Sequence, residues 1–131
     1  MNLISVLQNE HRTILSLLDD VACLGVGTEE GRKRLLKSKE LILAHLHKED
    51  EKLYPKLNKL EVTHDASTSF KNDMKDVSSF VLKFFCELEK SGDTEAVAIQ
   101  FKDVRQRLRD RIAKEEFALY PLFEKHVEHS A

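Results

Sequence analysis

The sequence of 131 residues is long enough for one domain with a single sizeable hydrophobic core. Apolar residues make up 41% and charged residues 34% of the chain, with only four glycines and two prolines. This balance favours long amphipathic helices over sheets, whose turns need more glycine and proline. The net charge of −2, with both signs interspersed, predicts no basic face for nucleic acid. No uncharged apolar run approaches the roughly 20 residues of a membrane span, so we expect no membrane partner.

Two further features predict a reducing compartment. The first residues, MNLIS, lack the basic start and apolar stretch of a secretory signal. Cys23 and Cys86 alone do not form a disulfide framework. We therefore expect a cytoplasmic protein and interpret both cysteines as small, buried apolar residues.

The spacing of apolar residues divides the first half of the chain into two helical segments. Residues 3–24 form the first segment, which the Gly-Val-Gly sequence at 25–27 ends. Thr28 is the predicted cap of the second segment, residues 29–60, in which Pro55 predicts a kink or break.

The second half of the chain follows the same plan. Residues 63–68 are predicted to form a loop, and residues 69–90 the third helix. Asp93 or Thr94 is the predicted cap of the fourth helix, which continues to about residue 127. Loops this short place consecutive helices side by side in opposite directions.

The two halves also resemble each other in sequence. Residues 45–55 (HLHKEDEKLYP) align without a gap with residues 111–121 (RIAKEEFALYP), and residues 10–23 align more weakly with residues 73–86. We therefore predict an all-α protein: an antiparallel up-down-up-down four-helix bundle built from a duplicated helical hairpin, in a single domain that spans residues 1–131.

Five polar or charged residues interrupt the apolar stripes that face the predicted core: His11, His45, Glu49, Arg111 and Glu115. At about 1.5 Å per residue they lie within a helical turn of one another in height, and so form one layer. Imidazoles and carboxylates on facing helices make a nitrogen and oxygen site for iron, manganese or zinc. One H-x-x-x-E pair is a weak signal by itself, but it is stronger in a duplicated bundle with a further histidine on the first helix.

These residues resemble the hemerythrin-like (HHE) domain family over nearly the full chain. The family pattern has a histidine on the first helix, H-x-x-x-E-E-x-x-L-Y/F-P on the second, a histidine on the third and a similar H-x-x-x-E on the fourth. His11 matches the first element, His45 and Glu49 with the L-Y-P at 53–55 match the second, and Glu115 with the L-Y-P at 119–121 matches part of the fourth. The resemblance implies a non-haem di-iron centre that carries or senses dioxygen, nitric oxide or redox state.

Two positions depart from the family pattern. Met74 stands where the third helix should offer a histidine, and Arg111 stands where the fourth should. Arginine is always cationic and cannot donate to a metal, so a second iron beside Arg111 would meet direct repulsion. We therefore expect at most one iron ion. Its expected ligands are His11, His45, Glu49 and Glu115.

Arg111 also leaves a metal-free alternative open. Its guanidinium is expected to pair bidentately with Glu115 or Glu49, because two inward carboxylates need a positive partner. A salt-bridge network would then replace the ion.

Two functions follow from these alternatives. The first is a metal-binding or sensing domain with an incomplete site, which takes a small diatomic ligand through iron and reports to an unknown protein partner. The second is a metal-free, degenerate bundle that acts as a scaffold or as an interaction or regulatory protein. We do not expect an enzyme, because oxidase or peroxidase chemistry usually needs the fuller ligand set.

The remaining aromatic and imidazole side chains have plainer expected roles. Tyr54 and Tyr120 are expected to close one end of the bundle, with contact to the inward carboxylates as an alternative role. Four histidines are expected on the surface: His47, His64, His126 and His129.

Overall fold

The computed structural model describes residues 2–90 and 94–128, and regular structure in these ranges is entirely helical. The all-α prediction is therefore confirmed for this part of the chain. The elements in chain order are α1 (Leu3–Leu24), α2 (Glu29–Lys48), η1 (Glu49–Leu53), α3 (Tyr54–Lys59), α4 (Glu61–Lys90), α5 (Thr94–Lys114), η2 (Glu115–Leu119), α6 (Tyr120–Phe123) and η3 (Glu124–Glu128), where η denotes a π-helical turn.

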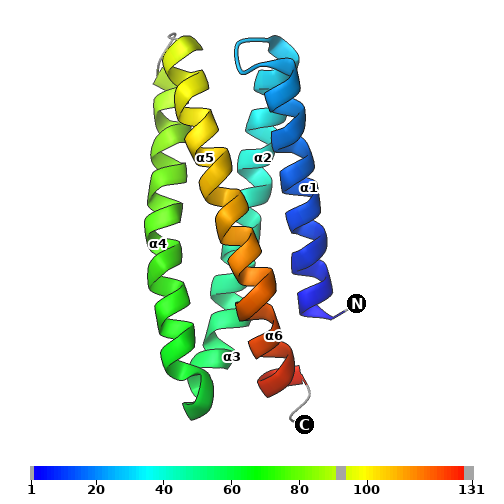
Figure 1. The fold of residues 1–131 in the computed structure, drawn as a ribbon, viewed down its shortest axis with the longest axis vertical. Helices are drawn as coiled ribbons and strands as arrows, with labels where there is room; N and C mark the ends of the chain where they lie inside the picture. The colour runs from blue at the N-terminus through cyan, green and yellow to red at the C-terminus, as the bar shows by residue number, and fades with distance from the viewer. Residues whose placement is uncertain (1, 91–93, 129–131) are drawn as a thin grey trace.

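The long helices lie side by side along the longest axis of the molecule (Figure 1). The chain passes from one end to the other in α1, returns through α2 to α3, ascends again in α4 and returns through α5 to α6. The start of α1 and the short helix α6 consequently lie toward the lower end of the molecule in this view.

The first two helices begin and end at residues that satisfy their free backbone groups. The Asn2 side chain accepts a hydrogen bond of 2.8 Å from the backbone N–H of Ser5 and caps α1. Gly25 ends this helix with a φ of 91°, which favours glycine because it has no Cβ. The Thr28 hydroxyl accepts a bond of 3.0 Å from the N–H of Gly31 and caps α2, as predicted.

The loop predicted at residues 63–68 is wrong, because α4 already begins at Glu61. The chain reverses at the single extended residue Leu60, whose φ and ψ are −92° and 129°. The Thr63 hydroxyl then donates a bond of 2.6 Å to the carbonyl oxygen of Leu57, so this side chain joins the end of α3 to the start of α4. Thr63 and Ser67 are both buried, and the inward stripe of α4 therefore extends through small polar residues that resemble a loop in the sequence.

The kink or break expected near Pro55 takes the form of a π turn. Proline lacks an N–H and its ring collides with the carbonyl four residues earlier in an α-helix. The turn widens at η1, where the N–H of Tyr54 bonds to the carbonyl of Glu49, five residues back. The same happens at η2, where the N–H of Tyr120 bonds to the carbonyl of Glu115 just before the second proline. Each of the two L-Y-P sequences is thus accompanied by a π turn.

The predicted layer of His11, His45, Glu49, Arg111 and Glu115 is buried and forms a polar tier. This tier divides the hydrophobic core into two clusters. The larger cluster lies toward the α1–α2 turn and includes Leu18, Leu35, Phe85 and Phe101. The smaller one lies toward the chain ends: Ile4, Leu7, Leu53, Tyr54, Leu57, Leu119, Tyr120 and Phe123. On α1, Leu7 belongs to one cluster and Ile14 to the other, with the buried His11 between them.

The surface differs from expectation at the cysteines, since Cys23 and Cys86 are both exposed. They lie just outside the buried stripes of α1 and α4, so their prediction as core residues is wrong.

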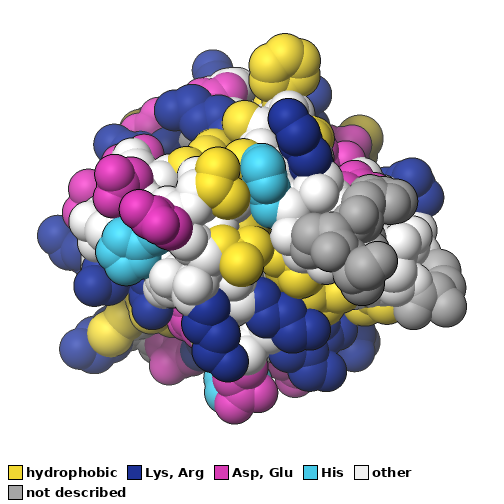
Figure 2. All heavy atoms as spheres, turned by 90° about the horizontal axis from the view of Figure 1, so that it is seen from below, with side chains coloured by type: hydrophobic (Ala, Val, Ile, Leu, Met, Phe, Trp, Pro, Cys, Tyr) yellow, Lys and Arg dark blue, Asp and Glu magenta, His cyan; other side chains and the backbone are white. Residues whose placement is uncertain are grey.

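At the lower end of the molecule, basic and acidic side chains are interspersed among hydrophobic and histidine side chains (Figure 2). In the described ranges, no helix combines the length and the apolarity that crossing a bilayer requires.

Gly31 provides a test of the α1–α2 turn. A Cβ added there would lie 1.9 Å from the carbonyl oxygen of Gly25, so the backbone of the turn must move. We expect Gly31→Ala to lower the free energy of unfolding by about 1–3 kcal/mol, the usual cost of overpacking. An unconstrained helical glycine would instead gain about 1 kcal/mol from alanine. Urea unfolding beside the exposed control Lys37→Ala measures this, and a gain for Gly31→Ala would contradict the close packing.

Candidate metal centre

Four side chains of the predicted layer meet inside the molecule. α1 contributes His11, α2 contributes His45, and the first residues of the π turns η1 and η2 contribute Glu49 and Glu115. Each is at most 4% exposed. Each offers one ligand atom, and these atoms all lie within 4.8 Å of one another. The four residues expected as metal ligands are therefore brought together by four separate segments of the chain.

The two imidazoles face each other through the same ring atom. The Nε2 atoms of His11 and His45 are 3.0 Å apart. The Nδ1 atoms point outward: that of His11 lies 3.0 Å from Glu116 Oε2, and that of His45 lies 2.8 Å from Glu10 Oε1. A carboxylate can only accept, so both Nδ1 atoms donate, and each neutral ring keeps its lone pair on the inward Nε2.

These outer carboxylates are a part of the site that the sequence prediction did not assign. Glu10 also accepts a hydrogen bond from the ammonium group of Lys48, so it joins His45 to a cation near the surface. Burial raises the pKa of Glu10, but the bonds from Lys48 and His45 outweigh burial and lower it. Their positions in the sequence could have identified them, because Glu10 directly precedes one expected ligand and Glu116 directly follows another.

Tyr120 contacts the carboxylates of the tier, which is the second of the two roles expected for it. Its hydroxyl donates to Glu49 Oε2 at 2.9 Å and lies 3.1 Å from His11 Nε2 and 3.3 Å from Glu115 Oε2. The side chain is fully buried, and its ring stacks on that of His11 with 5.4 Å between centroids. Burial, together with the charges of Glu115 and Glu49, raises the pKa of Tyr120, so the hydroxyl keeps its proton as a donor. The residue that was expected to close the bundle end thus holds two of the carboxylates.

One proton is held between the two histidines. Burial lowers the pKa of His11, and the charge of His45 lowers it further. Burial also lowers the pKa of His45, but its bond to Glu49, that carboxylate's charge and the bond to Glu10 outweigh this and raise it. His45 therefore carries the proton and donates to the lone pair of His11.

A second proton is held between the two buried acids. Burial and the nearby charge of Glu49 raise the pKa of Glu115 well above its ordinary value. Burial opposes the ionisation of Glu49, but bonds from the Glu115 carboxyl and from His45 hold its pKa at about 2. The tier thus contains an ionised Glu49, a protonated Glu115 and an imidazolium at His45.

Arg111 lies in the same tier but does not pair as expected. Its Nη2 donates to the backbone oxygen of Phe70 at 2.9 Å and to the Tyr54 hydroxyl at 3.2 Å. Its Nε is 3.8 Å from Glu115 Oε1 and makes no hydrogen bond. The expected bidentate pairing is therefore wrong, because groups on α4 and α3 hold the fork of the guanidinium. Its charge still lowers the pKa of Glu115, in opposition to burial.

Met74 occupies the remaining side of the tier. It is buried and lines a small cavity of about 20 Å³ together with His11, His45, Arg111 and Glu115, among others. This space is about that of one water molecule. Its thioether is a poor donor to a hard metal, and it fills the position from which a third-helix histidine would project.

The other histidines lie away from the tier. His47 and His64 are exposed, His126 is half-buried, and His129 lies outside the described residues. Tyr54 lies at the edge of the tier through its bond to Arg111.

The chain is thus a helical protein with a buried set of two imidazoles and two carboxylates that could hold a metal ion. The chain matches the model of the hemerythrin HHE cation-binding domain over residues 2–123 and belongs to that family. Comparison with curated proteins and with solved structures found no match for this chain.

The residues of the tier fit one cation. Once a cation displaces the proton on His45, the two Nε2 lone pairs face each other across 3.0 Å. A buried carboxylate oxygen of Glu49 without a hydrogen-bond partner and a second carboxyl at Glu115 converge with them on one small volume. These are the neutral imidazole and oxygen donors that iron, manganese and zinc accept. They do not fit two cations, because a guanidinium and a thioether occupy the other side.

The Tyr120 hydroxyl provides a test of how the tier is held. We expect Tyr120→Phe to lower the free energy of unfolding of the metal-free protein by about 1–3 kcal/mol, because a buried carboxylate loses its donor. Tyr54→Phe is the matched control, since Arg111 keeps its bond to the Phe70 carbonyl. Urea unfolding of both variants should show the larger loss at Tyr120. Equal losses would mean that the hydroxyl does not hold the acids.

Proposed function

We propose that this protein binds a single metal ion, with iron as the first candidate, through His11, His45, Glu49 and Glu115. Membership of a cation-binding family and the cluster of these four side chains support this proposal. Bound iron would supply a redox-active centre with room for a small exogenous ligand. The chain's own contribution is to orient the donors and to exclude bulk water from them.

The facing Nε2 atoms are the observation that carries the proposal. Glu10 and Glu116 hold both rings so that their lone pairs point at one spot. Two Nε2 atoms that both act as acceptors would repel each other at 3.0 Å in a buried site. At least one proton must therefore lie between them. A metal ion satisfies the same lone pairs and also neutralises Glu49.

Arg111 and Met74 limit the site to one ion. Arg111 introduces a permanent positive charge 3.8 Å from Glu115, on the side where a second ion would lie. A second ion bound by Glu115 would lie close to this guanidinium, and two unit charges about 4 Å apart repel by about 4 kcal/mol at an effective dielectric constant of about 20.

A binding or sensing role suits this site better than catalysis. The cavity of about 20 Å³ beside the imidazoles accepts a group no larger than about one water molecule, which suits a small diatomic ligand of the iron. We propose that ligand or redox state is reported to a protein partner in the cytoplasm. We propose no role for nucleic acid or for a membrane.

The scaffold that we propose for this site is an antiparallel up-down-up-down four-helix bundle formed by a duplicated hairpin. The support is the recurrence of one local structure. Each half places a carboxylate at the first residue of a π turn and ends that turn at the leucine of an L-Y-P sequence. Equivalent positions of the two halves then face one another.

A metal-free scaffold is the second candidate, and the bonds of Arg111 favour it. The guanidinium links α5 to α4 and α3 through Phe70 and Tyr54, which is a structural role that requires no ion. In that case the protons on His45 and Glu115 are the resting state, and the bundle serves as an interaction or regulatory protein.

Metal content separates the two candidates. After incubation with excess Fe(II) under anaerobic conditions, or with Zn(II), and desalting, we expect one ion per chain by elemental analysis. Glu49→Gln should abolish retention, because it removes the ionised carboxylate, whereas Glu51→Gln on the same π turn is exposed and should change nothing. No retained ion in the unsubstituted protein would favour the metal-free scaffold.

The same assay tests the limit to one ion. Met74→His combined with Arg111→His restores two nitrogen donors and removes the positive charge. The retained metal should then rise from one toward two ions per chain. Two ions in the unsubstituted protein would refute the proposed role of Arg111.

Metal affinity should also depend on pH. In the metal-free tier His45 and Glu115 hold protons because their pKa values are raised, and an incoming cation must displace them. The affinity for Zn(II) should therefore rise with pH, by about tenfold per unit for each displaced proton, until both groups are deprotonated. Calorimetry in buffers of different ionisation enthalpy should detect this proton release. Binding at pH 6 as tight as at pH 8 would contradict the proton assignment.

A further inference from the structure

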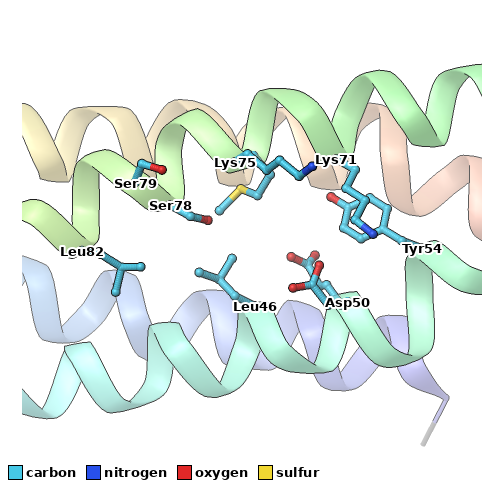
Figure 3. A pocket seen from close by; sticks show the side chains of 10 residues that line it. Leu46, Asp50, Tyr54, Lys71, Lys75, Ser78, Ser79 and Leu82 are labelled. Atoms are coloured by element: carbon cyan, nitrogen blue, oxygen red, sulfur yellow. The ribbon is translucent and has the colours of Figure 1, made fainter.

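A surface pocket adjoins the tier and shares Glu49 with its ligand cluster. It has a volume of about 340 Å³ and lies between α4 and the segment formed by α2, η1 and α3 (Figure 3). This volume is at the lower end of the range of small-molecule sites. The residues that line it are Leu46, Glu49, Asp50, Tyr54, Lys71, Met74, Lys75, Ser78, Ser79 and Leu82.

Two lysines on one face of α4 distinguish this pocket. Lys71 and Lys75 are four residues apart, and both project over it (Figure 3). Among the residues that the structure describes, neither has a carboxylate within 4.0 Å. By contrast, Lys33 and Lys37, with the same spacing on α2, lie within 4.0 Å of Glu30 and Glu40 respectively. The two pocket lysines therefore lack an internal counter-ion.

One end of the pocket is apolar. Leu46 of α2 and Leu82 of α4 lie at this end (Figure 3), and Met74 is also part of the lining. Leu82 is 44% exposed, so its side chain is accessible to a ligand. The Ser78 hydroxyl lies between this apolar end and the lysines and provides a hydrogen-bond donor.

We propose that this pocket binds a small organic acid that carries one negative charge and a short apolar body. The acid group would lie between Lys71 and Lys75, and the apolar part would cover Leu46 and Leu82. At about 30 Å³ per water-sized group, the pocket holds roughly ten such groups, which limits the ligand to a small molecule. This inference does not rest on a bound metal, because none of these four side chains belongs to the tier.

The charges of the lining favour a monoanion. Lys71 and Lys75 contribute two positive charges, and Asp50, on the opposite wall, contributes one negative charge (Figure 3). Glu49 also lines the pocket, but its side chain is only 1% exposed. The charges of Lys71, Lys75 and Asp50 sum to about +1, which one carboxylate or sulfonate neutralises. A second negative charge on the ligand would meet Asp50.

A set of probes with one common apolar body tests this inference. Amide chemical shifts of the ¹⁵N-labelled full chain, with and without added Zn(II), should report saturable binding of hexanoate at residues 46–54 and 71–82. We expect the Kd of hexanoate to be at least tenfold lower than that of hexan-1-ol, hexylammonium or acetate. Hexanesulfonate should bind like hexanoate, and hexyl phosphate, largely a dianion at pH 8, no more tightly.

Substitutions then assign the binding to the pocket. Lys71→Gln with Lys75→Gln should weaken hexanoate binding at least tenfold, whereas Lys33→Gln with Lys37→Gln removes the same charge elsewhere and should change it less than twofold. Leu82→Ser should weaken hexanoate but not acetate. Thermal unfolding of each variant confirms that the fold is retained.

Three results would overturn the inference. Equal weakening by both lysine pairs, or acetate binding as tight as hexanoate, would show only a diffuse attraction of anions to a basic surface. The absence of saturable shifts with hexanoate would show that the pocket has no such ligand. A tighter dianion would refute the charge balance with Asp50. The metal assay above is unaffected by any of these results, so the two proposals fail separately.

Discussion

The contact between the Nε2 atoms of His11 and His45 is the interaction on which the rest of this site depends. Two acceptors at 3.0 Å in a buried tier require a positive species between or beside them. The outer carboxylates Glu10 and Glu116 make this unavoidable, because they accept from both Nδ1 atoms and turn the lone pairs inward. In the metal-free tier, one imidazole and one acid hold protons, and a cation that binds there would displace these protons. The outer carboxylates Glu10 and Glu116 keep both rings oriented for such binding.

The backbone reaches this arrangement through two prolines. Each L-Y-P sequence forces a π turn, and each π turn begins at an inward carboxylate. The extra residue in the turn shifts the buried stripe by one position, so that leucine and tyrosine are buried in succession at 53–54 and again at 119–120. Tyr120 can therefore reach the acids while its ring packs in the core. The two π turns therefore determine both the positions of the inward carboxylates and the packing of the lower cluster.

The periodicity of apolar residues was sufficient to predict the helices and the members of the tier, because both follow from the 3.6-residue repeat. It failed where small polar residues are buried, as at Thr63 and Ser67, which resemble a loop until their place on the inward stripe of α4 is seen. The partners of Arg111 could not be predicted either. A backbone oxygen at Phe70 competes with the carboxylates for the guanidinium, and backbone acceptors have no signature in the sequence. The orienting roles of Glu10 and Glu116 depend on ring orientation, which periodicity does not specify.

The two halves of the chain differ at the positions where the family pattern has its histidines. Where one half keeps His45, the other has Arg111, and the guanidinium turns to α4 and α3 for its partners. Met74 replaces the opposite donor with an apolar side chain that lines both the inner cavity and the surface pocket. The Met74 side chain therefore lies between the tier and the surface pocket. A substitution at Met74 therefore bears on both the proposed metal site and the proposed anion pocket.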